Sequence, residues 1–252
     1  MRDNPRSGLR LTRRTFLGAA GALAVTQPRF AFAQDKPIRI GVLTDMSSLY
    51  ADVTGKGSVV ATQMGVEDFN ALGKPLKVEV LSADHQNKAD VAASIARKWF
   101  DTEGVDMIVD VPNSAVALAV NSVAREKNKV MIATGPGTPE LTGKSCSPNG
   151  VHWAYDNYAL ANVATAPLVQ KGLKTWYFLT ADYSFGHALE AEATKVVLAN
   201  GGQVLGASRH PLNSSDFSSY LLQAQASKAQ VVGLANAGAD MTNALKQANE
   251  FG

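Results

Sequence analysis

The sequence predicts an α/β protein built as two doubly wound lobes of parallel sheet joined by a hinge. Short apolar runs that suit buried strands alternate with segments whose apolar residues recur at helical spacing. Such alternation implies right-handed crossovers between parallel strands. It is interrupted once, at residues 135–156, by an irregular stretch rich in Gly, Pro, Ser and Thr. We therefore expect a first lobe over 34–153 and a second over 154–252.

The first series of elements begins after Pro37. The apolar runs predict strands at 38–43, 77–81, 107–111 and 130–133. Helical spacing predicts helices at 58–70, 88–100 and 115–126. The helix at 58–70 carries its expected apolar face on Val59, Val60, Met64, Val66 and Phe69. Asn113 or Ser114 is the expected N-cap of the helix at 115–126, because short polar side chains accept from the free N–H groups of a first turn.

The second series repeats the pattern. Strands are predicted at 175–180, 203–207 and 231–235, and helices at 158–171, 188–200, 217–226 and 240–249. Pro167 is expected to kink the first of these helices, and Gly201-Gly202 ends the second. No strand follows the last helix before Gly252. We therefore expect the second lobe to be incomplete in this chain.

The first 33 residues are predicted to be a twin-arginine export signal. Arg13-Arg14 precede an apolar run at 16–25, and Ala31-Phe32-Ala33 supplies a small-x-small cleavage site. The run is too short for a permanent membrane anchor. The pattern favours a soluble protein exported to the periplasm, and the alternative is a flexible basic N-terminus of a cytoplasmic protein.

Removal of this leader changes the charge of the chain. Six of the 24 Lys and Arg residues and one of the 22 Asp and Glu residues lie in it, which leaves 18 and 21 and a net charge of −3. That balance gives no basic stripe for nucleic acid or an anionic membrane surface. Cys146 is the one cysteine, so no intrachain disulfide can form.

Candidate binding residues follow three strands of the first lobe. In parallel sheets, ligands bind at the carboxyl ends of strands, where helix N-termini present free N–H groups. Hydroxyl, amide and glycine residues gather in these loops: Ser47, Ser48 and Tyr50, then Asn113 and Ser114, then Gly135, Pro136 and Thr138. They suit a small carboxylate, although a helix cap and a Gly-Pro-Gly turn would explain part of the pattern equally well.

The sequence shows no recognised catalytic or metal-binding motif. It has no nucleophile elbow, no phosphate loop and no Cys or His spacing typical of zinc sites. We therefore expect neither an enzyme nor a cofactor or metal. Asp182, beside Tyr183, could orient a polar ligand group or cap a turn.

Several segments in their order along the chain resemble the periplasmic branched-chain amino acid binding proteins of ABC importers. They are Ile38-Arg39-Ile40-Gly41-Val42-Leu43-Thr44-Asp45-Met46, Gly104-Val105-Asp106-Met107-Ile108-Val109, Met131-Ile132 with Gly135, Pro139-Glu140-Leu141-Thr142, Thr180-Ala181-Asp182-Tyr183-Ser184-Phe185-Gly186 and Asp216-Phe217-Ser218-Ser219-Tyr220-Leu221-Leu222. The resemblance covers essentially the whole chain after the leader, and no single motif in it is diagnostic.

This resemblance implies a two-lobed clamp that closes on a small amino acid or related acid and delivers it to a membrane permease. It implies that the loops at 113–114 and 135–138 hold the ligand carboxylate, that Ser47, Ser48 and Tyr50 border the pocket, and that Tyr183 or Phe185 faces it from the second lobe. Tyr155 lies at the crossover and could face the cleft. Pro136 departs from the family pattern, because proline has no N–H to donate. We expect a monomer.

Two other functions remain open on the sequence. One is an exported enzyme on a Rossmann-like sheet, and the other is a ligand-binding sensor domain. The first would show turnover or a bound chromophore, and the second would be fused to a membrane segment.

Overall fold

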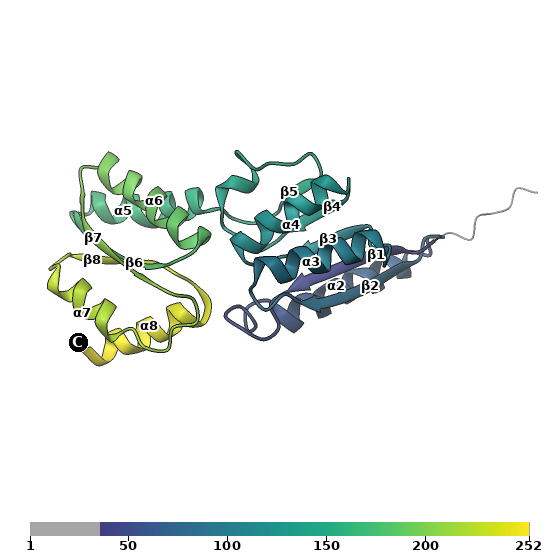
Figure 1. Ribbon diagram of the computed structural model, residues 1–252. Helices are drawn as coiled ribbons and strands as arrows, with labels where there is room; N and C mark the ends of the chain where they lie inside the picture. The colour runs from purple at the N-terminus through teal and green to yellow at the C-terminus, as the bar shows by residue number, and fades with distance from the viewer. Residues whose placement is uncertain (1–35, 252) are drawn as a thin grey trace, which may run out of the picture. The chain divides into compact units, whose positions relative to one another are not determined.

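The computed structural model describes residues 36–251, so the predicted leader at 1–33 lies outside the described residues. Eight strands form two parallel sheets within this part of the chain (Figure 1). The first sheet has the order β2-β1-β3-β4-β5 and the second has the order β7-β6-β8. The predicted fold class, parallel α/β with two sheets, is confirmed.

The first sheet and its helices occupy residues 38–152. Its strands are β1 (Ile38–Thr44), β2 (Val78–Asp84), β3 (Met107–Asp110), β4 (Val130–Ala133) and β5 (Gly150–His152). Its helices are α2 (Gly55–Ala71), α3 (Ala89–Asp101) and α4 (Ser114–Glu126), followed by a short 3-10 turn, η1 (Pro139–Leu141).

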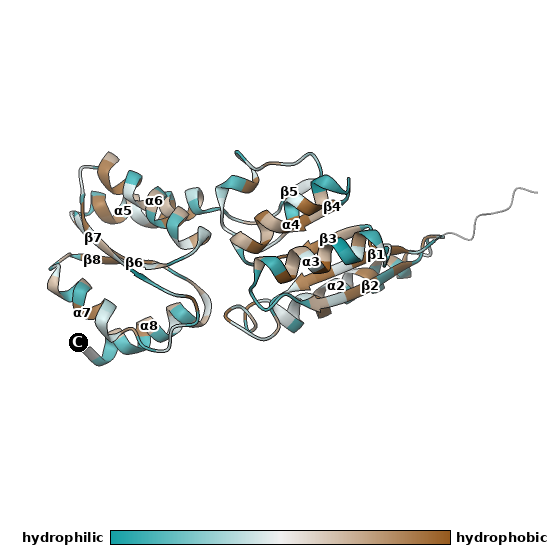
Figure 2. Ribbon diagram, viewed as in Figure 1, coloured by the Kyte–Doolittle hydropathy of each residue, from teal (hydrophilic) through white to brown (hydrophobic). Residues whose placement is uncertain are grey.

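The second sheet and its helices occupy residues 157–251. Its strands are β6 (Thr175–Ala181), β7 (Gln203–His210) and β8 (Val231–Ala235). Helices α5 (Asn157–Gln170) and α6 (Ser184–Ala199) lie on one face, and α7 (Ser218–Ala226) and α8 (Gly238–Phe251) lie on the other (Figure 1). Hydrophobic residues run along the strands and over α5 and α6 (Figure 2).

Helix α3 shows how the apolar pattern selects the packed face. Ala92, Ala96, Trp99 and Phe100 recur at the spacing of one helical face, and all four are buried against the first sheet and α4. The Trp99 ring lies directly over Gly41 of β1, where a Cβ would collide with it. The glycine therefore allows the indole to pack flat against the strand.

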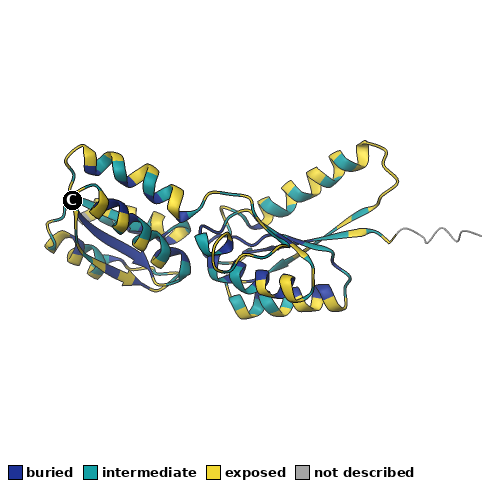
Figure 3. Cartoon of the chain, turned by 90° about the horizontal axis from the view of Figure 1, so that it is seen from above, coloured by how far each residue is buried: buried dark blue, intermediate teal, exposed yellow. Residues whose placement is uncertain are grey.

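Helix α2 differs from its prediction. The expected apolar face is only partly buried, since the side chains of Val60 and Met64 are more than half exposed. Figure 3 shows most of this helix as exposed, in contrast to the strands beneath it. The apolar periodicity predicted that this segment is helical, but it did not predict how far the helix is exposed.

Strand β5 corrects the prediction that 135–156 is irregular throughout. It pairs in parallel with β4, and the first sheet therefore has five strands rather than four. The strand is only three residues long and Val151 is 41 % exposed, so it carries no continuous apolar run that periodicity could detect. The other strands and helices begin and end within four residues of their predicted limits, and α5 continues through Pro167.

Candidate ligand-binding site

A cavity of about 370 Å³ lies at the carboxyl ends of the strands of both sheets. Its volume falls within the range of about 300–1,000 Å³ that small-molecule pockets occupy. The lining residues come from loops after β1, β3, β4, β6 and β8 and from the connection before α5. They are Tyr50, Val53, Thr54, Pro112, Thr134, Gly135, Tyr155, Tyr183, Phe185, Ala237 and Gly238.

The loop after β1 is held by a buried carboxylate. Asp45 is fully buried and accepts from the backbone N–H of Ser48 and of Tyr50, at 3.0 and 2.9 Å. The Ser48 hydroxyl also donates to Asp45, and the Ser47 hydroxyl donates to Asp84 at 2.6 Å. Both predicted serine hydroxyls therefore stabilise the loop, and neither residue lines the cavity. Tyr50 is the predicted residue of this loop that does.

The loop after β3 has a strained backbone and a free buried hydroxyl. Asp110 and Val111 both have positive φ, at 83° and 54°, which is costly for a β-branched residue and is common at functional sites. Asn113 caps α4 through its side-chain oxygen, which accepts from Val116 N–H at 3.0 Å. This confirms the predicted cap. Ser114, at the first turn of α4, is 1 % exposed, and its Oγ has no hydrogen-bond partner within the described residues.

The loop after β4 packs its backbone against the loop after β3. A Cβ on Gly135 would lie 3.0 Å from Cα of Pro112, so the two loops approach this closely only because residue 135 is glycine. The carbonyl of Pro136 accepts from Nε2 of His152 at 2.6 Å, and the Thr138 hydroxyl accepts from Glu140 N–H. Gly135 lines the cavity, whereas Pro136 and Thr138 shape the loop behind it.

Aromatic side chains close the cavity from the second sheet. Tyr183 and Phe185 stand at the start of α6 with their ring centroids 6.0 Å apart, and Tyr155 reaches the cavity from the connection. The Tyr50 and Tyr183 hydroxyls are hydrogen-bonded to each other. Burial raises the pKa of Tyr50 to about 12 and the pKa of Tyr183 well above its ordinary value, so both phenols are neutral.

Asp182 is turned to another partner. Its carboxylate accepts from Nε2 of His187 at 2.7 Å in an exposed pair, and it does not line the cavity. Of the twelve predicted binding residues, five line the cavity: Tyr50, Gly135, Tyr155, Tyr183 and Phe185. The remaining seven lie in or beside the loops that shape it.

The part of the cavity wall that follows β8 was not predicted from the sequence. Ala237 and Gly238 line the cavity from the loop between β8 and α8. Their signal in the sequence is their place after a predicted parallel strand, because ligands bind at the carboxyl ends of such strands in the second sheet as in the first. No sequence pattern marks Val53 and Thr54 as lining residues, because they reach the cavity only through the turn that the Asp45 carboxylate stabilises.

A buried histidine lies beneath these loops. His85 is fully buried after β2, and its Nδ1 accepts from Asn87 N–H at 3.0 Å, which places the proton on Nε2. Burial lowers the pKa of His85, against the opposing attraction of Asp45, Asp84 and Asp110. The ring is therefore neutral in the folded protein.

The lowered pKa of His85 predicts acid sensitivity. A group whose pKa is lower in the folded state stabilises the fold above its unfolded pKa, here 6.5, and that contribution is lost as pH falls toward the folded pKa. Urea unfolding should therefore show that the free energy of unfolding falls between about pH 7.5 and about pH 5.5, with part of the loss coming from this residue. The variant H85N should show a smaller loss over the same interval. Equal losses in the two proteins would contradict the assignment.

Comparison with known proteins identifies the family. A family model described as periplasmic binding protein matches residues 37–252. The chain belongs to the periplasmic binding protein family. Its parallel sheets and covering helices are those of the type I fold in this family. Within residues 36–251, no helix is long and apolar enough to cross a membrane.

Proteins similar to this periplasmic binding protein support the same family assignment. Leu/Ile/Val-binding protein homolog 8 of Brucella suis is 26 % identical over 95 % of the chain and 61 % of the relative. A periplasmic binding protein from Burkholderia mallei is 56 % identical, with a TM-score of 0.83 over 85 % of the chain and 57 % of that structure. A branched chain amino acid ABC transporter periplasmic ligand-binding protein from Burkholderia xenovorans is 43 % identical, with a TM-score of 0.69 and the same coverage. The chain thus spans about three fifths of the length of these proteins.

Proposed function

We propose that this protein is exported to the periplasm as a monomer, binds a small amino acid or related carboxylate in the cavity, and delivers it to an ABC permease. Membership of the periplasmic binding protein family supports a binding role. The twin-arginine pattern around Arg13-Arg14 supports export. The lining of the cavity supports the chemistry of the cargo.

The observation that carries the proposal is the free hydroxyl of Ser114. A buried hydroxyl without a partner costs folding free energy, and such groups in native proteins call for an explanation. Ser114 lies behind the lining residue Pro112, two positions away, at the first turn of α4, where backbone N–H groups without helical partners favour an anion. A cargo carboxylate would accept from both, and no Lys or Arg lines the cavity within the described residues.

The apolar part of the cargo has matching surroundings. Rings of Tyr50, Tyr155, Tyr183 and Phe185 make up much of the lining, and two phenol hydroxyls supply neutral donors and acceptors. Such a wall suits a branched aliphatic side chain or a benzene ring equally well. We therefore include both amino acids and benzoates as cargo classes.

The replacement S114A should weaken cargo binding by about 1–2 kcal/mol, or roughly 5- to 30-fold in Kd, because it removes one charge-assisted hydrogen bond. Isothermal titration of the full chain with leucine, isoleucine, valine, benzoate and 4-hydroxybenzoate would identify the cargo and measure the change.

S122A is the matched control, since Ser122 is exposed on the same helix. It should leave the affinity unchanged. Equal affinity of S114A and the wild type, with both folded, would contradict the role of Ser114. No binding across the panel by a cooperatively folded protein would contradict the proposed cargo.

A further inference from the structure

His85 lies next to the buried carboxylates at the carboxyl ends of the first sheet. Thr44 of β1 pairs with Asp84 of β2, so Asp45 and His85, each one residue further on, are neighbours. Both are fully buried. Asp110 ends β3, on the other side of β1, and is 4 % exposed. The buried imidazole is therefore within electrostatic range of these carboxylates.

The neutral ring of His85 stabilises the turn between β2 and α3. Gln86 and Asn87 both have positive φ, at 53° and 58°, which is uncommon for residues other than glycine. Nδ1 of His85 accepts from Asn87 N–H at 3.0 Å. A proton on Nδ1 would place two donors against each other, so the ring cannot be protonated without losing this hydrogen bond.

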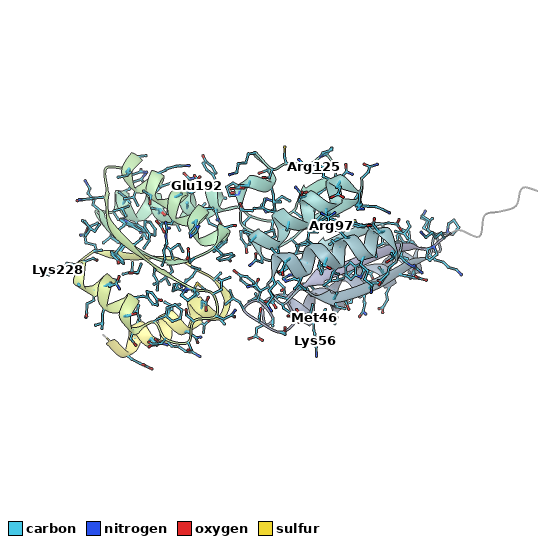
Figure 4. All side chains as sticks on the ribbon, viewed as in Figure 1. Met46, Lys56, Arg97, Arg125, Glu192 and Lys228 are labelled. Atoms are coloured by element: carbon cyan, nitrogen blue, oxygen red, sulfur yellow. The ribbon has the colours of Figure 1, made fainter. Side chains whose placement is uncertain are left out.

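The Asp84 carboxylate joins this turn to the loop after β1. It accepts from the N–H of Met46, on that loop, at 3.0 Å (Figure 4). It also accepts from the Ser47 hydroxyl at 2.6 Å. The same loop carries Tyr50, which lines the cavity. Movement of the turn at 84–87 therefore reaches the cavity wall through the hydrogen bonds of one carboxylate.

The two carboxylates nearest in the sheet also hold lining loops. Asp45 accepts from Tyr50 N–H at 2.9 Å, and Asp110 accepts from the Thr134 hydroxyl at 2.8 Å. Tyr50 and Thr134 both line the cavity. An imidazolium at His85 would attract both carboxylates, and it would compete with the N–H and O–H donors that they bind.

The charged residues at the start of α3, close to His85 in the chain, are exposed to solvent. They are Lys88, whose ammonium donates to the Gln86 side chain at 3.5 Å, and Asp90. Water and salt screen these charges, so the buried carboxylates have the larger effect on the ring. Burial lowers the pKa of His85, and the attraction of those carboxylates opposes it. The ring therefore becomes charged below pH 6.5.

We propose that protonation of His85 loosens the loops after β1 and β4 and thereby weakens cargo binding, so that the affinity of the site falls as pH falls. This inference rests on the proposed function, because it concerns regulation of the same cavity. The coupling is reciprocal. Cargo that binds better when His85 is neutral must also lower the pKa of His85.

Isothermal titration of the full chain with leucine and with benzoate, at about pH 7.5 and about pH 5, measures the effect on affinity. Carboxylates ionise near about pH 4, so both ligands keep their negative charge over this interval. The Kd of the ligand that binds should rise roughly two- to tenfold at the lower pH, because the loss is limited by the protonated fraction of His85.

Two variants assign the pH dependence to one histidine. H85N should lose most of it, because the asparagine oxygen can accept from Asn87 N–H, two residues on, and does not titrate. H187N is the matched control, since His187 is exposed and does not line the cavity. It should keep the dependence of the wild type.

NMR titration without added ligand tests the loosening of the loop apart from cargo. The backbone amide signals of Ser48 and Tyr50 should shift together with the ring signals of His85, at one midpoint below pH 6.5, because both amides donate to Asp45. In H85N these amide shifts should be absent over the same interval.

Amide shifts that persist in H85N, or that do not follow the ring of His85, would overturn the inference. Equal pH dependence of affinity in the wild type and H85N would also overturn it. If H85N does not fold, the midpoints of ring and amides in the wild type decide. No binding by folded protein at either pH would overturn the proposed function and the effect on affinity, while the amide shifts still test the loosening of the loop.

Discussion

Replacing Gly186 with alanine is expected to destabilise the fold by at least about 3 kcal/mol, at the upper end of what overpacking costs. Gly186 is buried in the first turn of α6, where the helix meets the ends of β6 and β8. A Cβ there would collide with the carbonyl oxygen of Ala181 and lie 2.9 Å from that of Ala235. Both are backbone atoms of paired strands, Ala181 in the central strand β6 and Ala235 in β8, so neither can rotate aside.

The same residue sets the site, because it brings the start of α6 against the sheet and thereby places Tyr183 and Phe185 at the cavity. Urea unfolding followed by circular dichroism measures the loss. G65A is the matched control of opposite sign. Gly65 lies within α2 with nothing within 4 Å of its Cβ position, so alanine should stabilise that helix by about 0.5–1 kcal/mol. A loss below about 1 kcal/mol in G186A would contradict the packing argument.

The strands were predictable where hydrophobicity was continuous. β1, β6 and β8 are predominantly apolar runs, and each was found within one residue of its observed ends. β5 was missed because three residues at a sheet edge bury too little to leave a pattern. Its place is decided by hydrogen bonds to β4, which are a property of the tertiary fold.

The sequence was sufficient to predict which loops form the site, but not which hydrogen bonds their serine hydroxyls make. The carboxyl-end rule located the loops that hold Tyr50 and Gly135. It could not decide that Ser47 would bond Asp84, 37 residues away, while Ser114 would remain without a partner. Two serines in equivalent positions after parallel strands differ only in what the fold brings beside them. That difference separates a residue that holds its loop from one that can hold a ligand.

The largest loss from a core truncation is expected at Phe217, where F217A should cost about 3–5 kcal/mol. Phe217 is fully buried between α7 and the second sheet, in a small core with Leu179 and Ala244. Its ring lies 4.8 Å from the His210 ring in an edge-on arrangement. Tyr220, Leu221 and Leu234 pack against this core from partly buried positions, and we expect them to fill only part of the space that the ring leaves.

Truncation of Phe217 should also reach the cavity wall. His210 donates from Nδ1 to the Pro211 carbonyl at 2.9 Å, so its Nε2 accepts from the Asn236 side-chain amide at 3.2 Å. Asn236 directly precedes Ala237 and Gly238, which line the cavity. Loss of the Phe217 ring beside His210 should therefore loosen the segment that carries this part of the cavity wall.

Urea unfolding of F217A and F217L measures how much of the stability loss comes from the buried volume that the ring fills. Leucine keeps most of the buried volume and should lose less than half as much stability as alanine, roughly 1–2 kcal/mol. If the His210–Asn236 contact transmits the change, F217A should also weaken cargo binding at temperatures where the protein remains folded. Stability loss with unchanged affinity would confine the effect of Phe217 to the core. A loss below about 1 kcal/mol in F217A would show that the core on this face of the sheet repacks freely.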